Sequence, residues 1–112
     1  MVVALHSVLK PGHEQAYVHD HLQIPADLAA SFERVGIHNW TIWRSGRDLF
    51  HLVDCDDYLA AADALDSDPA NHAWQALIGE HVEGFVVEGD GHAGELLAQV
   101  WTLADQTAAE PS

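Results

Sequence analysis

Two neighbouring runs decide the fold: IHNWTIWR, residues 37 to 44, and DLFHLVD, residues 48 to 54. Both runs are rich in β-branched and aromatic residues, which pack well on a pleated sheet. The Ser-Gly-Arg segment between them supplies the glycine-containing turn that joins antiparallel strands. The segment therefore predicts a β-hairpin that provides the second and third strands of a sheet.

A strand and a helical region precede this hairpin. Residues 2 to 9 are rich in Val and Leu and predict a first strand, which ends at the turn formed by Lys10, Pro11 and Gly12. From His13 onward the pattern is helical, with one stripe formed by Tyr17, His21 and Ile24. Pro25 either restarts or kinks this helix, and Gly36 is a natural stop.

Two more helices are expected after the hairpin. Asp56 can cap the first, and Asp68 followed by Pro69 opens the second, which carries Trp74. Residues 84 to 94 are glycine-rich and predict a loop. The run LLAQVWTL, residues 96 to 103, is compatible with either a strand or a helix.

If residues 96 to 103 form a strand, the order is β-α-β-β-α-β, which defines an α+β, ferredoxin-like fold. Its antiparallel sheet carries helices on one face and leaves the other open, so we expect a homodimer of the dimeric α/β-barrel type. We assign residues 1 to 104 to a single domain and predict that residues 105 to 112 form a flexible tail.

Composition limits the possible partners and the compartment. Four basic residues oppose 18 acidic ones, and the net charge of −14 disfavours nucleic acid, anionic membranes and phosphorylated substrates. A neutral substrate is therefore expected. The single cysteine, Cys55, cannot form an intramolecular disulfide, and no apolar run is long enough to span a membrane. These features favour a cytoplasmic protein.

A metal site is not expected. The imidazoles of His19 and His21 would point about 200° apart on a helix, so the His19-Asp20-His21 cluster is a poor chelate. The acidic run at residues 54 to 57 lacks the spacing of oxygen ligands that calcium requires and is better explained as a strand end and a helix cap.

Three segments resemble blocks of the L-rhamnose mutarotase family. KPGHEQAYVHDHLQIPADL, residues 10 to 28, is similar to the opening block, in which a helix bears a Tyr and, four residues on, a His. Residues 36 to 54 resemble the next block, with Asn39 followed by the aromatic Trp40. DPANHAWQALI, residues 68 to 78, resembles the tryptophan-bearing helix of the family and places Trp74 in register.

The resemblance implies a cofactor-free mutarotase that interconverts the α and β anomers of a neutral monosaccharide, a 6-deoxyhexose such as L-rhamnose. It implies that His21 is the catalytic acid-base group and that four residues bind substrate: Tyr17, Asn39, Trp40 and Trp74. A His with its ordinary pKa of about 6.5 suits proton transfer at neutral pH. The family often has a second Trp where Gln75 stands and a Trp where Ile24 stands, so the preferred sugar stays open.

Other interpretations remain. Tyr17, Trp40 and Trp74 also fit plain core packing at helical or strand spacing. A ferredoxin-like monooxygenase or isomerase, or a non-catalytic sugar-binding module, would share the architecture. If His21 is not the acid-base group, the candidates that remain are His38, His51 and His72.

Overall fold

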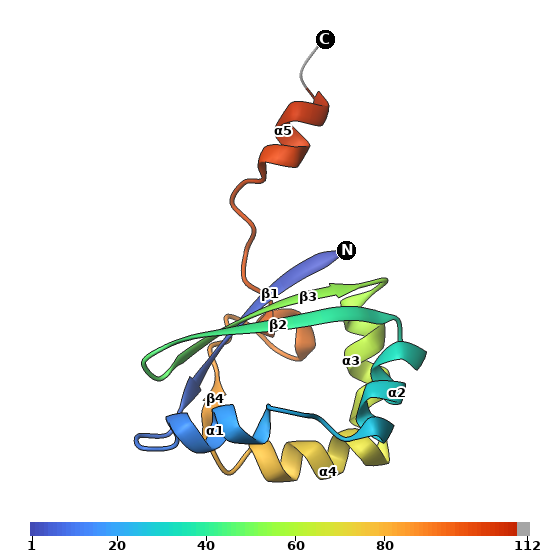
Figure 1. Cartoon of the computed structure of the whole chain (residues 1–112). Helices are drawn as coiled ribbons and strands as arrows, with labels where there is room; N and C mark the ends of the chain where they lie inside the picture. The colour runs from blue at the N-terminus through green and yellow to red at the C-terminus, as the bar shows by residue number, and fades with distance from the viewer. Residues whose placement is uncertain (110–112) are drawn as a thin grey trace.

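The computed structural model describes residues 1–109 and has the shape of a sheet covered by helices on one face (Figure 1). The elements follow the order β1 (Val2–Leu9), α1 (Glu14–Asp20), α2 (Ala26–Arg34), β2 (Ile37–Ser45), β3 (Asp48–Cys55), α3 (Tyr58–Asp66), α4 (Pro69–Ile78), β4 (Val82–Phe85), the short 3-10 helix η1 (His92–Glu95) and α5 (Leu103–Ala109).

The sheet has the strand order β2-β3-β1-β4 with antiparallel neighbours throughout. This order and the β-α-β-β-α-β succession confirm the ferredoxin-like prediction. The β2–β3 hairpin is also confirmed, and its register pairs Trp40 with Val53 and Ile42 with His51. Paired residues share a face of the sheet, and so do residues two apart on one strand. Trp40 and His51 therefore lie on the same face as Val53, which is buried beneath the helices.

The fourth strand is not the predicted one. β4 lies at Val82–Phe85, overlapping the segment from Gly84 that was predicted to be a loop. It pairs with β1 over Ser7 to Leu9. Of residues 96 to 103, Leu96 and Leu97 make backbone contacts with β1, through a bridge to Leu5 and a bond to the Ala4 carbonyl. Residues 97 to 102 form neither a strand nor a helix, so the pairing of this segment with β1 is limited to these contacts.

The helix boundaries differ from the predictions in two places. α1 ends at Asp20 with His21 as its C-cap, and extended backbone at Pro25 restarts the chain as α2, so the proline does not kink one continuous helix. Asp57, not Asp56, caps α3, because its carboxylate accepts a bond from the amide of Ala60 at 3.2 Å. Asp68 caps α4 as predicted.

The core lies between the sheet and the helices. One cluster surrounds Leu5 and Val53, and a second surrounds Leu9 and Leu49, which are all fully buried. Cys55 belongs to the first cluster and is free and buried, and burial raises the pKa of its thiol. Side chains from these clusters also form the walls of the cavity described below.

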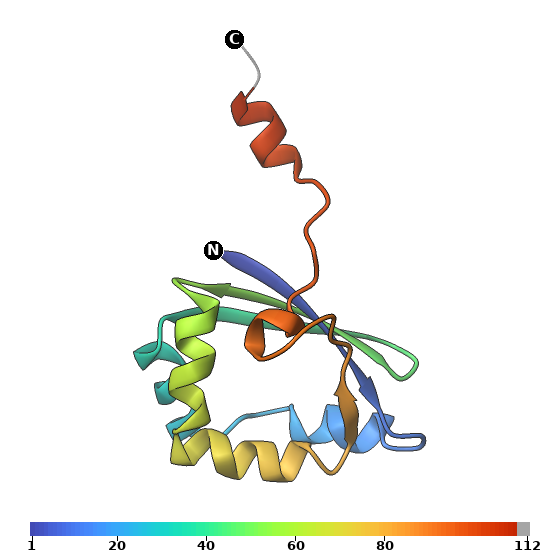
Figure 2. The ribbon, with the colours of Figure 1, turned by 180° about the vertical axis from the view of Figure 1, so that it is seen from behind.

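The other face of the sheet and the C-terminal arm, residues 97–109, expose apolar side chains. Trp43, Phe50 and Leu52 are 54%, 41% and 40% exposed on β2 and β3. The arm ends in α5, which stands away from the domain in both views (Figures 1 and 2). The tail predicted from residue 105 begins inside α5, and residues 110–112 lie outside the described residues. Within the described part of the chain, no helix is long and apolar enough to cross a membrane.

Candidate active site

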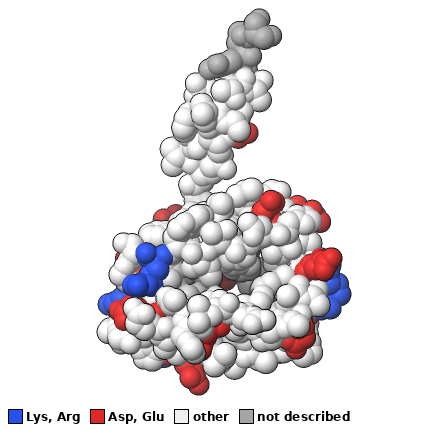
Figure 3. Space-filling model, in the orientation of Figure 1, with Lys and Arg blue, Asp and Glu red and all other residues white. Residues whose placement is uncertain are grey.

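A cavity of about 1280 Å³ opens between the helices and the inner face of the sheet. It appears as the central hollow of the space-filling view (Figure 3). Ligand sites typically measure about 300 to 1000 Å³, so a monosaccharide fits with room to spare. Rings from both layers line it: Tyr17, His21, Trp40, His51, Trp74 and Phe85.

His21 enters the cavity at the C-terminal end of α1. Its Nδ1 lies 3.0 Å from the carbonyl oxygen of Tyr17, which only accepts, so Nδ1 carries the proton and Nε2 has a free lone pair. The imidazole packs against the ring of Tyr17, with centroids 4.2 Å apart, and meets Trp74 edge-on at 5.0 Å. Burial lowers the pKa of His21 below its usual 6.5, so the imidazole is neutral at pH 7.

Tyr17 is buried, one helical turn before His21. Burial raises the pKa of its phenol to about 12, so the hydroxyl keeps its proton throughout the neutral range. A protonated phenol can both donate to and accept from a sugar hydroxyl. Tyr17 and His21 both line the cavity, as the i, i+4 spacing predicts.

The two tryptophans come from opposite walls, whereas Asn39 lies apart from the rings. Trp74 projects from α4 and is buried, and Trp40 projects from β2 and stacks on Phe32 with centroids 5.7 Å apart. Asn39 is exposed at the rim, beside the irregularity of β2 between Ile37 and Asn39. The structure thus brings Tyr17, His21 and Trp74 together directly.

His51 lines the cavity, although the sequence indicated it only as an alternative acid-base group to His21. It is 5% exposed, accepts a bond at Nδ1 from the Trp40 indole at 3.1 Å and lies 2.9 Å from Ser7 Oγ. Burial, with smaller effects from His21 and His6, lowers its pKa to about 4. The alternation of buried residues along β3 was the available signal for its inward orientation.

The other two alternatives to His21, His38 and His72, form contacts outside the group of rings in the cavity. His38 is exposed and forms an ion pair with Asp56 at 2.7 Å, which raises the pKa of the imidazole. His72 is exposed and contacts the carbonyl of Asp66. Neither belongs to the group of rings around His21.

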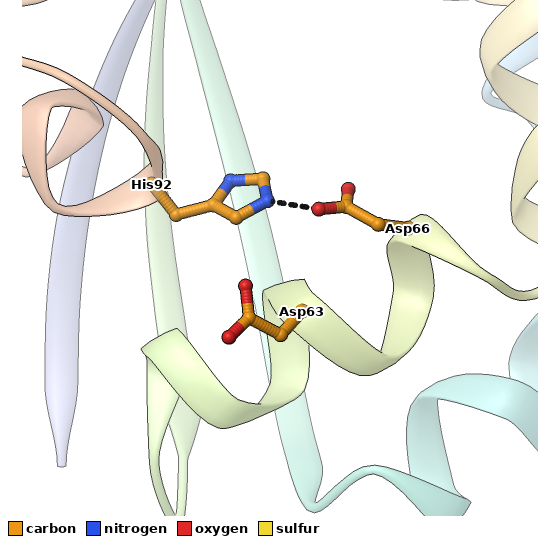
Figure 4. A group of neighbouring side chains, drawn as sticks. All are labelled: Asp63, Asp66 and His92. Carbon is orange, nitrogen blue, oxygen red and sulfur yellow. Dashed lines mark hydrogen bonds and ion pairs between the residues drawn. The ribbon is translucent and has the colours of Figure 1, made fainter.

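Asp63, Asp66 and His92 form a group that spacing in the sequence did not reveal, because its members come from α3 and η1 (Figure 4). Their ligand atoms lie within 4.8 Å of one another, which is compatible with a cation. The His92 imidazole lies 2.7 Å from Asp66 and 3.2 Å from Glu95, and these bonds raise its pKa. These contacts hold the His92 imidazole beside the acidic side chains of α3 and η1.

The protein is thus an α+β domain of the ferredoxin-like type, whose cavity presents a neutral imidazole among aromatic walls. The family model of L-rhamnose mutarotase matches residues 2–103, and the chain belongs to this family. The resemblance seen in the sequence is thereby confirmed. The protein is a sugar mutarotase, an isomerase, which decides among the activities that the sequence left open.

Solved structures share the fold. An L-rhamnose mutarotase from Formosa agariphila superposes with a TM-score of 0.71 at 18% identity, covering 92% of this chain and 98% of that one. The tetracenomycin F2 cyclase from Streptomyces glaucescens, a type-II polyketide cyclase, gives 0.63 at 12% identity, covering 91% and 95%. A search of the curated proteins found no match. Because the fold is shared by different chemistries, the family match carries the functional conclusion.

Proposed function

We propose that this mutarotase interconverts the anomers of a neutral 6-deoxyhexose such as L-rhamnose, with His21 as the acid-base group. The observation that carries the proposal is the state of His21: a neutral imidazole, fixed by the Tyr17 carbonyl and packed between Tyr17 and Trp74. Trp40 and Trp74 supply flat apolar walls suited to the C–H faces of a sugar and its C6 methyl. Asn39 is proposed to bind substrate from the rim.

The reaction needs one proton to leave the anomeric hydroxyl and one to reach the ring oxygen. Nε2 of His21 accepts the first proton and becomes part of an imidazolium. Because the anomeric oxygen and the ring oxygen are bonded to the same carbon, the imidazolium can return that proton to the ring oxygen as the C1–O5 bond breaks. Rotation about C1–C2 and the reverse steps give the other anomer, and no proton is gained or lost.

The test of the proposal is exchange NMR on a panel of aldoses. We expect the protein to accelerate anomer interconversion of L-rhamnose more than that of aldoses whose C6 carries a hydroxyl, because the walls are apolar. Rates measured before and after exhaustive chelation should agree, since the proposed proton path uses no metal. A rate that disappears on chelation and returns with added metal would contradict this path.

Tyr17→Phe should weaken catalysis less than loss of the imidazole. The change keeps the buried ring and removes one hydroxyl, so the expected loss is about one neutral hydrogen bond, roughly 0.5 to 1.5 kcal/mol in kcat/KM. Exchange NMR measures it, with circular dichroism as a check of folding. A loss as large as that of an acid-base group would assign proton transfer to the phenol instead.

We also propose that two copies associate through the open face of the sheet. Trp43, Phe50 and Leu52 form an apolar surface there. The arm leaves the domain on the same side of the sheet (Figure 1), and its residues Val100, Trp101 and Leu103 are exposed. A second copy supplies apolar surface of the same kind to cover both.

Light scattering at micromolar concentration should therefore give twice the monomer mass of 12.2 kDa. Leu52→Glu should lower this mass to that of the monomer, because a charge would be buried without a partner. Leu59→Glu is the matched control, since Leu59 is 43% exposed on α3, in the helical layer. A wild-type protein that stays monomeric would contradict the proposal.

We also propose that the protein resides in the cytoplasm, which is supported by the single buried cysteine, Cys55.

A further inference from the structure

Three polar groups from three neighbouring strands form a hydrogen-bonded chain on the inner face of the sheet. The indole Nε1 of Trp40 on β2 donates to Nδ1 of His51 on β3 at 3.1 Å. Since an indole can only donate, Nδ1 carries no proton, and the neutral ring must carry its proton on Nε2. Nε2 lies 2.9 Å from Oγ of Ser7 on β1, so it donates to the serine.

The direction of this chain determines what Ser7 can do. Its oxygen accepts the proton of His51, so its own O–H is left to donate to another group. Ser7 is 1% exposed and lines the cavity, beside the ring of Phe85, which packs on His51 with centroids 5.6 Å apart. A hydroxyl held in this way is a directed donor with little freedom to turn away.

We propose that the Ser7 hydroxyl binds an oxygen of the sugar, and that His51 is the positioning residue that orients both this hydroxyl and the Trp40 wall. The inference rests on the proposed function. A single neutral donor among buried groups suits a hydroxyl or ether oxygen, and it offers no charge to hold an anion. A neutral polyol is therefore the class of ligand that the Ser7 hydroxyl is suited to bind.

His51 acts here without exchanging protons. Both of its ring nitrogens are engaged, one by Trp40 and one by Ser7, so neither is free to take a proton from the substrate. In wild-type protein, nitrogen NMR should accordingly find His51 protonated on Nε2 and unprotonated on Nδ1. The opposite tautomer would reverse the direction of the chain and overturn the proposal.

The first variant is Ser7→Ala, which fits the space of the serine. We expect L-rhamnose to bind about 2- to 12-fold more weakly in an NMR titration, with the exchange rate at saturation nearly unchanged. Ser31→Ala is the matched control, because it removes another buried serine hydroxyl from α2, away from the cavity lining. It should bind the sugar as the wild type does.

His51→Ala and the double variant complete the test. If His51 acts through Ser7, the double variant should bind the sugar within about twofold of the weaker single variant, because coupled residues are not additive. Effects that multiply would overturn the positioning role. Wild-type exchange with unchanged binding in Ser7→Ala would overturn the inference alone. A wild-type protein that exchanges no aldose would overturn the proposed function and this inference with it.

Discussion

His21→Ala is expected to slow anomer exchange by about 10²- to 10⁴-fold while the domain stays folded. Removal of a proton-transfer group typically has an effect of this size, because the acid-base path through the site is lost. The aromatic walls formed by Trp40 and Trp74 remain, so sugar affinity should survive. His21 caps α1 from outside the helix and lies between rings instead of inside either core cluster, which favours survival of the fold.

The control is His19→Ala, which removes an exposed imidazole from the same helix. Exchange NMR on both variants should show the loss only in His21→Ala, with circular dichroism and a sugar titration confirming folding and binding. Near-normal exchange in a folded His21→Ala protein would exclude His21. Proton transfer would then have to be assigned to another group that lines the cavity, such as the phenol of Tyr17.

The second large effect concerns stability at mildly acidic pH. His51 has a pKa of about 4 in the folded protein and the ordinary value of about 6.5 when unfolded. Between these values the unfolded chain binds more protons than the folded one, so this residue makes stability fall as pH falls. From pH 7 to pH 5 its contribution to the loss is about 2 kcal/mol, and the loss is complete below pH 4.

Urea unfolding of the wild type and of His51→Gln at pH 7 and pH 5 measures this contribution. Glutamine stays neutral at both values, so the variant should lose about 2 kcal/mol less between them than the wild type does. The comparison of the two pH-dependent changes cancels the many carboxylates common to both proteins. Equal changes in the two proteins would show that His51 titrates alike in the folded and unfolded states.

Local patterns in the sequence were sufficient to predict much of the fold. The hairpin was predicted because runs of β-branched and aromatic residues flank a glycine turn, and the start of α4 because Asp68 precedes Pro69. β4 was not predicted because four residues that include a glycine have little intrinsic preference for a β-strand. Its position depends on the free edge of β1, which is a property of the assembled sheet.

In the site too, some contacts follow from local sequence spacing and others depend on how the sheet assembles. Tyr17 and His21 are neighbours because residues four apart meet on a helix, so their contact follows from local geometry. Ser7 and His51 are 44 residues apart, and they meet only because β1 pairs with β3 in one register. The group of Asp63, Asp66 and His92 likewise depends on where η1 packs against α3.

The order of the strands also governs how a growing chain can fold. β1 is synthesised first, yet its neighbours follow much later: Val3 pairs with Val53, and Ser7 with Phe85. Closing such long loops costs entropy before any contact is gained, whereas the β2–β3 hairpin closes locally. On the ribosome β1, one of the two inner strands, is therefore synthesised long before its partners, and the sheet can be completed only after Phe85 has emerged.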